Sequence, residues 1–222
     1  MRGASADSMA ALLEDLSPAG GVRATASRLA TKVTGALTGG DTGATGVTGR
    51  LDADQADRVS DDLFGVADVL RREARLRRTF TDGSLPAAAK AGLARDVFAS
   101  AVDSHSMDLV TSAVGHRWTA PRDLADALEH VGVVAAVKAA EQRDEADRVE
   151  SELFTFEQAL DDPGLRDALS DPARSSADKR QLIGDLLGDR ASSTTVRLVR
   201  QAASGSHRTV ALAVEDYQKI SA

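Results

Sequence analysis

The sequence predicts an all-α protein, and three observations support that prediction. Ala, Leu and Val dominate the 42% of residues that are hydrophobic, whereas aromatic residues make up only 3% of the 222-residue chain. Ala and Leu favour helices, while strands favour aromatic and β-branched residues. Apolar residues also recur at spacings of three and four, and no stretch alternates convincingly between apolar and polar residues.

The first 50 residues divide into two parts. Residues 1–16 predict an amphipathic helix that is capped by Ser5 or Asp7, because small polar residues satisfy the free amides of a first turn. Residues 17–50 are rich in Gly, Thr and Ala and lack apolar periodicity, so we expect a flexible insert there. The stretch VRATASRLATKV inside the insert could form a short helix.

Helical patterns follow one another through the rest of the chain. Over residues 54–70 one buried face is predicted by the spacing of Val59, Leu63, Val66 and Leu70. After a turn at Asp82-Gly83, Ser84 is the expected cap of the next helix. A long helix is expected from Pro121 to about residue 148.

An internal repeat of about 89 residues organises these helices. It aligns Leu63-Phe64 with Leu153-Phe154, Leu70 with Leu160, Asp82 with Asp171, Lys90 with Lys179 and Leu93 with Leu182. The segment HSMDLVTSAV from His105 continues the alignment with TTVRLVRQAA from Thr194. We therefore predict two tandem copies of a small helical bundle that share the long helix. We call residues 51–142 the first unit and residues 143–222 the second unit.

The last helix of the second copy lacks a sequence signal for its end. No Gly, Asn or Pro stop signal follows AVEDYQKISA before Ala222, whereas the corresponding helix of the first copy continues further. We expect the natural protein to continue beyond Ala222.

Charge and composition disfavour several classes of protein. The 27 basic and 34 acidic residues give a formal net charge of −7, which does not suit a nucleic-acid-binding protein. The longest apolar stretch, Val131 to Val137, is far shorter than the roughly 20 residues of a membrane-spanning helix. We expect no direct membrane insertion. Without cysteine, the chain has no thiol nucleophile and no thiolate zinc site.

A search for catalytic, cofactor-binding or metal-binding residues identifies none. The histidines fall in no zinc-type spacing, and the Gly-rich run over residues 39–49 lacks the Lys-Ser/Thr ending of a phosphate loop. Residues 103–106 contain the residue types of a hydrolase triad, but they are adjacent and are expected to cap a helix. The basic cluster RREARLRR, from Arg71 to Arg78, is interpreted as a solvated face, with a site for an acidic partner as the alternative.

Several separate blocks resemble a known family. They are MRGASADSMAALLEDL, VLRREARLRRTFTD, RWTAPRDLADALEHV, DRVESELFTFEQALDDPGLRDALSD and LAVEDYQKISA. Together they are similar to the delta subunit of actinobacterial-type rotary ATP synthases, the counterpart of the mitochondrial oligomycin-sensitivity-conferring protein. The resemblance implies a helical bundle, duplicated in such members, and a C-terminal α/β part that is absent or not covered here.

The resemblance also implies a function. The chain would be a non-catalytic stator subunit without cofactors, which anchors the catalytic head of a proton-driven ATP synthase to the peripheral stalk and resists rotor torque. Its partners would be the alpha subunits of the head and the b subunits of the stalk. It would lie at the cytoplasmic face of the plasma membrane as a peripheral component.

Helix-in-groove docking would suit such a clamp. By resemblance, the groove of the second unit would lie between the long helix from Pro121 and the helix from Ser193. The candidate contact residues are Leu124, Leu128, Val131, Val196 and Val199, and the alternative for each is a place in the internal core. Which unit holds the alpha-subunit helix stays open.

Two other functions compete with this hypothesis. A helical scaffold or regulatory adaptor unrelated to ATP synthase would suit the tandem units and acidic surface equally well. A helical enzyme with dispersed site residues is the least favoured alternative, because the sequence shows few aromatic residues and no cluster of titratable groups without partners.

Overall fold

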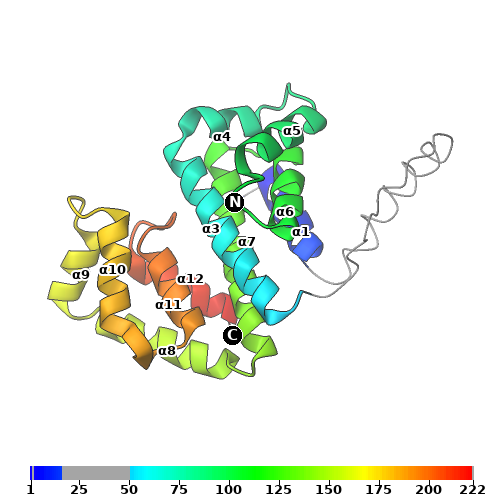
Figure 1. The fold of residues 1–222 in the computed structure, drawn as a ribbon. Coiled ribbons are helices and arrows are strands. Elements are labelled where there is room, and N and C mark those ends of the chain that lie inside the picture. The colour runs from blue at the N-terminus through cyan, green and yellow to red at the C-terminus, as the bar shows by residue number, and fades with distance from the viewer. Residues whose placement is uncertain (2, 17–50, 222) are drawn as a thin grey trace.

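The computed structural model describes residues 1, 3–16 and 51–221, and within these ranges every regular element is a helix (Figure 1). The predicted insert over residues 17–50, with its possible short helix, lies outside the described residues. The all-α prediction is confirmed for the part that is described. The α-helices are α1 (Ala4–Leu16), α3 (Ala53–Arg72), α4 (Ala74–Thr81), α5 (Ala87–Phe98), α6 (Ser104–Gly115), α7 (Pro121–Gln142), α8 (Ala146–Ala159), α9 (Pro163–Ser170), α10 (Ser176–Leu187), α11 (Ser193–Ala202) and α12 (Val210–Ser221).

Helix α7 runs through the centre of the molecule and belongs to two hydrophobic clusters (Figure 1). The first cluster includes residues of α1 and α3 to α7, and the second cluster includes residues of α7 to α12. On α7 one stripe, with Leu124, Leu128 and Val131, faces the first cluster, and another, with Val133 and Ala136, faces the second. The helix is therefore apolar on most of its circumference, as a centrally buried helix must be.

The long helix ends at Gln142 and does not continue to residue 148 as predicted. Asp144 has a φ of 57°, in the left-handed region that ends a helix, and α8 begins two residues later at Ala146. Aspartate tolerates this conformation better than most residues because its short side chain can form local hydrogen bonds. The chain can therefore turn at this point without a glycine.

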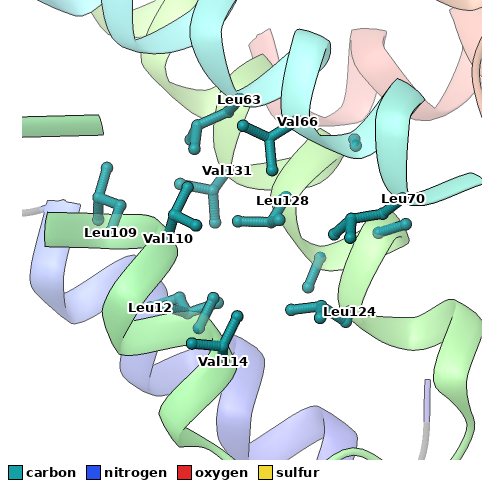
Figure 2. Close-up of a cluster of buried hydrophobic side chains, with 14 of the residues drawn as sticks. Leu12, Leu63, Val66, Leu70, Leu109, Val110, Val114, Leu124, Leu128 and Val131 are labelled. Carbon is teal, nitrogen blue, oxygen red and sulfur yellow. The ribbon is translucent and has the colours of Figure 1, made fainter. Parts of the chain in front are cut away.

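The first cluster lies where α1, α3 and α6 meet the first half of α7 (Figure 2). The face predicted over residues 54–70 is confirmed, since Val59, Leu63, Val66 and Leu70 are at most 2% exposed. Side chains from all four helices interdigitate there, including those of Leu12, Val110 and Leu128 (Figure 2).

The observed helix caps match the predicted ones at some positions and differ at others. Asp103 caps α6 as expected, and its carboxylate accepts a hydrogen bond from the amide of His105 at 2.8 Å. Ser5 caps nothing, because it lies inside α1, fully buried, and donates a hydrogen bond to Asp123 at 2.7 Å. Ser84 stays in the turn with Asp82, and Pro86 precedes the first residue of α5.

The repeat is visible in the order of the helices and in their polar contacts. Helices α4, α5 and α6 correspond to α9, α10 and α11, and α12 corresponds to the first half of α7. In the first unit the carboxylate of Asp62 accepts a hydrogen bond from the amide of Asp103 at 2.8 Å. In the second unit Glu152 accepts one from the amide of Ser192, also at 2.8 Å. The predicted boundary between the units, at residues 142 and 143, stays a prediction.

One more correspondence explains why the two units are not separate bundles. Helix α1 packs against α6 and α7, and the second half of α7 packs in the same way against the equivalent helices α11 and α12. Helix α7 is thus the last helix of the first unit and takes, for the second unit, the position that α1 has in the first.

Helices α3 and α7 approach each other closely at Gly132. A Cβ atom at this position would lie 2.7 Å from the ring of Phe64 and 3.3 Å from the backbone oxygen of Ser60. Glycine therefore provides the space that the Phe64 ring fills. Although Phe64 belongs to α3, its side chain is 7% exposed and lies in the second cluster.

We predict that Phe64→Ala destabilises the protein by about 3 kcal/mol, because it removes a large buried ring and leaves a cavity. Urea unfolding followed by circular dichroism measures this loss. The matched control is Phe154→Ala at the equivalent position of the repeat, where the ring is 55% exposed. The control should change stability by less than about 0.5 kcal/mol. Equal losses in the two variants would contradict the packing described here.

Candidate partner-binding groove

The groove predicted in the second unit lies between the second half of α7 and α11. Val199 on α11 is fully buried in the second cluster. Val196, on the same helix, is half-buried and lines a hollow of about 830 Å³ beside the groove, together with residues of α3, α8 and α10. The structure therefore brings Val196 and Val199 together on the helix where they were expected.

The other three candidate residues lie elsewhere. Leu124, Leu128 and Val131 are at most 1% exposed, and all three face the first cluster, on a different stripe of α7 from the groove. The α7 residues that line the groove are instead Val133, Ala136 and Ala140, which belong to the second cluster. Contact of the five predicted residues with a partner stays a prediction, and the buried members would have to become accessible first.

Side chains of the chain's own helix α3 reach both helices of this pair. The Phe64 ring packs over Gly132 on the α7 side. On the α11 side, Arg197 donates hydrogen bonds to the carboxylates of Asp57 at 2.6 Å and Asp61 at 2.7 Å. Charge-assisted bonds of this kind are among the stronger ones in proteins. An apolar ring and paired charges thus fix α3 against α7 and link it to α11.

A buried carboxylate joins the two units near the other end of α3. Glu129 on α7 is 2% exposed. Its oxygens accept hydrogen bonds from the Arg71 guanidinium of α3, from the Tyr217 hydroxyl of α12 at 2.6 Å and from the amide of Ser206 at 3.0 Å. A Cβ atom at Gly205 would lie 2.1 Å from the carboxylate, so the loop before α12 can approach it only with glycine there.

These partners determine how Glu129 ionises. Burial alone would raise the pKa of Glu129, but the charge of Arg71 and the hydrogen bonds from Tyr217 and Ser206 outweigh burial and lower it. Burial together with the Glu129 charge raises the pKa of the Tyr217 hydroxyl well above its usual value. Glu129 is therefore ionised and Tyr217 is protonated at neutral pH, as their hydrogen bond requires.

Sequence patterns did not reveal this group of residues. The cluster from Arg71 to Arg78 was predicted to be a solvated face, but Arg71 is turned inward to Glu129 and Asp126. Arg77 is also used within the fold, since it donates to the carbonyl of Leu70 at 2.6 Å at the end of α3. The available signal was Glu129 itself, an acidic residue between the apolar positions Leu128 and Val131 of the long helix, which requires a partner when it is buried.

Within the described ranges, no group of three His, Asp or Glu side chains is placed to hold a metal ion. None of the described helices is both long and apolar enough to cross a membrane.

Over the described residues the chain is all-helical, its helices recur in the same order in two units, and α3 packs against α7 while its carboxylates pair with Arg197 of α11. Residues 133–219 match the family model of the ATP synthase delta (OSCP) subunit. The chain is 49% identical over 165 residues to ATP synthase subunit delta of Nocardioides sp., which covers 74% of this chain and 60% of that protein. The chain is thus similar to the ATP synthase delta (OSCP) family over residues 133–219 and to proteins named ATP synthase subunit delta over a larger part of its length.

Two further relatives carry the same name. ATP synthase subunit delta of Salinispora tropica is 42% identical over 148 residues, which is 66% of this chain and 54% of the relative. The protein of Frankia alni is 41% identical over 169 residues, which is 75% of this chain and 61% of the relative. The chain thus spans between 54% and 61% of the length of these three relatives.

We predict that Glu129→Gln destabilises the protein by about 3 kcal/mol at neutral pH, because it leaves the charge of Arg71 without its nearest partner. Urea unfolding at several pH values measures the effect. The pKa of Glu129 is lower in the folded state than its ordinary value of 4.5. Its contribution to stability is therefore complete above about pH 4.5 and is lost as the pH falls through the folded-state pKa.

The difference between wild type and Glu129→Gln should accordingly shrink as the pH falls below about 4.5. Glu215→Gln is a suitable control, because it breaks an exposed pair with Lys219 and should leave the unfolding midpoint unchanged. A Glu129→Gln variant as stable as the wild type at neutral pH would show that this carboxylate does not join the units.

Proposed function

We propose that this chain is part of a non-catalytic stator subunit of a proton-driven ATP synthase. In this role it anchors the catalytic head to the peripheral stalk and resists the torque of the rotor. The 49% identity to an ATP synthase subunit delta carries the proposal. That similarity favours this function over a helical scaffold unrelated to ATP synthase.

The arrangement of the helices suits such a role. A clamp transmits torque only when its parts do not turn against each other. In this chain α7 contributes to both hydrophobic clusters, and Glu129 binds groups from α3 and from the second unit. Among the described residues Glu129 is the least exposed charged side chain, and its partners all belong to the fold, which supports a mechanical role.

The proposed partners are the alpha subunits of the catalytic head and the b subunits of the stalk. We place the subunit at the cytoplasmic face of the plasma membrane, as a peripheral component of the complex. We propose that an amphipathic N-terminal helix of an alpha subunit docks between two helices of this chain.

The first unit is the better candidate for this docking. In the second unit side chains of α3 reach both α7 and α11, so an incoming helix would have to displace Phe64 and break the pairs of Arg197 with Asp57 and Asp61. The equivalent pair beside the first unit is α6 and the N-terminal helix α1. Met107 on α6 is the repeat counterpart of Val196, and it is only partly buried against the first cluster, as are Met9 and Leu13 on α1.

A synthetic N-terminal helix of an alpha subunit from one of the organisms above tests the proposal. Calorimetry should detect binding to the folded chain with a Kd of about 1–10 μM. Met107→Asp should weaken binding at least about tenfold, because it places a charge on the docking surface without opening the core. Absence of binding to a chain shown to be folded by circular dichroism would contradict the proposed function.

The matched control is Val196→Asp, which makes the same change at the equivalent position of the second unit. It should leave the Kd within about twofold of the wild type, because α3 already covers that groove. Loss of binding in Val196→Asp alone would instead assign the alpha-subunit helix to the second unit.

A further inference from the structure

The short helix α4 and the end of α3 present three arginines to solvent. Arg75 and Arg78 of α4 are exposed and lie three residues apart, so their side chains share one face of that helix. Arg72, the last residue of α3, is 66% exposed and pairs with Asp68 at 3.2 Å. Within the described ranges, Arg75 and Arg78 form no ion pair. We call Arg72, Arg75 and Arg78 the arginine face.

Two other arginines of the same segment are used inside the molecule. Arg71 is turned inward to Glu129, and Arg77 donates a hydrogen bond to the carbonyl of Leu70 at 2.6 Å. The five arginines between residues 71 and 78 therefore divide into two that hold the fold together and three that face outward.

The repeat shows which side of α4 the fold requires. Helix α9 has eight residues, as α4 has, and the two helices lie about 89 residues apart in the same register. Leu76 and Phe80 of α4 pack in the first cluster, and their counterparts Leu165 and Leu169 pack in the second cluster. The apolar, inward side is thus kept in both copies, and it fixes the direction in which Arg75 and Arg78 point.

The outward positions differ in charge between the two copies. In the same register each arginine of the face is replaced by an aspartate or a glycine, namely Asp161, Gly164 and Asp167. A helix of the same length forms at the same place without these positive charges. The arginine face is therefore not needed to build the unit.

Solubility does not account for the arginine face either. The chain has a formal net charge of −7, and a net charge far from zero favours solubility. Three arginines bring this net charge closer to zero, so they act against that effect. The guanidinium group of arginine is instead suited to recognition, because its planar fork pairs with a carboxylate through two hydrogen bonds.

The chain supplies few carboxylates to this face. Helix α4 packs against α3, α5 and α7, so the neighbours that its own unit provides are all in place. Figure 1 shows α4 at the end of the molecule away from α8 and α12. In residues 17–50 the only acidic residue is Asp41. The carboxylates that would match the arginine face therefore belong to another molecule.

The chemistry of α4 favours an acidic helix over a membrane surface. A helix that lies in a membrane inserts apolar side chains beside its basic ones, but Leu76 and Phe80 of α4 are turned into the core. A helix that carries Asp or Glu three or four residues apart presents them on one face, at the spacing of Arg75 and Arg78.

We propose that the arginine face binds an acidic α-helix of a partner protein. Carboxylates of that helix pair with Arg75 and Arg78, and a further one competes with Asp68 for Arg72. The proposal does not depend on the assignment of the chain to a stator, and it concerns a different surface from the one on α6 that is proposed for the alpha subunit.

A labelled acidic peptide serves as the probe. It is an end-capped, alanine-based helix with glutamates spaced three and four residues apart and a fluorophore at one end. Its fluorescence anisotropy should rise saturably as the chain is added, with a Kd of about 10–100 μM at low salt. Binding should weaken severalfold between about 20 and 200 mM salt, because the contact is between exposed charges. The same peptide with glutamine in place of each glutamate should not bind.

Two matched double variants locate the contact. Arg75→Gln combined with Arg78→Gln should weaken binding of the acidic peptide at least about tenfold. Arg166→Gln combined with Arg174→Gln removes the same charge from exposed positions of α9 and the turn after it, and it should leave the Kd within about twofold. Circular dichroism of both variants should match the wild type, since all four side chains are exposed.

Three outcomes would overturn the proposal. The first is no saturable response up to about 1 mM of the chain, an affinity too weak for a specific contact. The second is an equal loss of binding in the two double variants, which would show only a general attraction between charges. The third is binding of the chain to vesicles with about 30% phosphatidylserine that the Arg75 and Arg78 substitutions abolish, without binding of the peptide. That result would assign the arginine face to a lipid surface.

Discussion

The structure depends on one helix that both hydrophobic clusters share. Because α7 packs against α1, α3 and α6 on one side and against α8, α11 and α12 on the other, it must be apolar on most of its circumference. Where α3 crosses it, α7 also needs a residue without a side chain, and Gly132 is that residue. Two copies of one helical unit thereby become a single body, since neither copy has a complete core without this helix.

Glu129 is a charged side chain on the largely apolar surface of α7, and its partners explain why its charge can lie inside the fold. A buried carboxylate costs several kcal/mol unless its charge and lone pairs are satisfied. Arg71, Tyr217 and Ser206 satisfy it from three different segments. An apolar side chain at this position could pack in several registers, whereas this carboxylate accepts its hydrogen bonds in only one arrangement of α3, α7 and α12.

Sequence patterns predicted much of this fold because most of it is local. The buried face of α3, the start of α7 at Pro121 and the repeat all follow from spacing and capping residues. The end of α7 could not be predicted in this way, because Asp144 turns the chain within a charged stretch that contains no glycine or proline. The residues of the groove did not follow either. A helix that is buried on nearly all sides has several valid apolar stripes, and spacing alone cannot assign Leu124 or Val133 to one cluster or the other.

The contacts between distant segments were the hardest to predict. Arg71 lies among other arginines in a sequence typical of a solvated face, and only the fold brings it to Glu129. Likewise, nothing in the repeat distinguishes Phe64 from Phe154, yet one ring is buried and the other exposed. The difference arises from the neighbouring residues, because Gly132 of α7 leaves room for the ring of Phe64.

The most direct test of this account is whether the two units unfold together. The chain has one tryptophan, Trp118 in the first cluster, and one tyrosine, Tyr217 in the second. Urea unfolding can therefore be followed in each unit, by Trp118 fluorescence and by the absorbance of Tyr217. If α7 and Glu129 make the units one cooperative body, the two transitions will coincide. Two transitions with separate midpoints would contradict it.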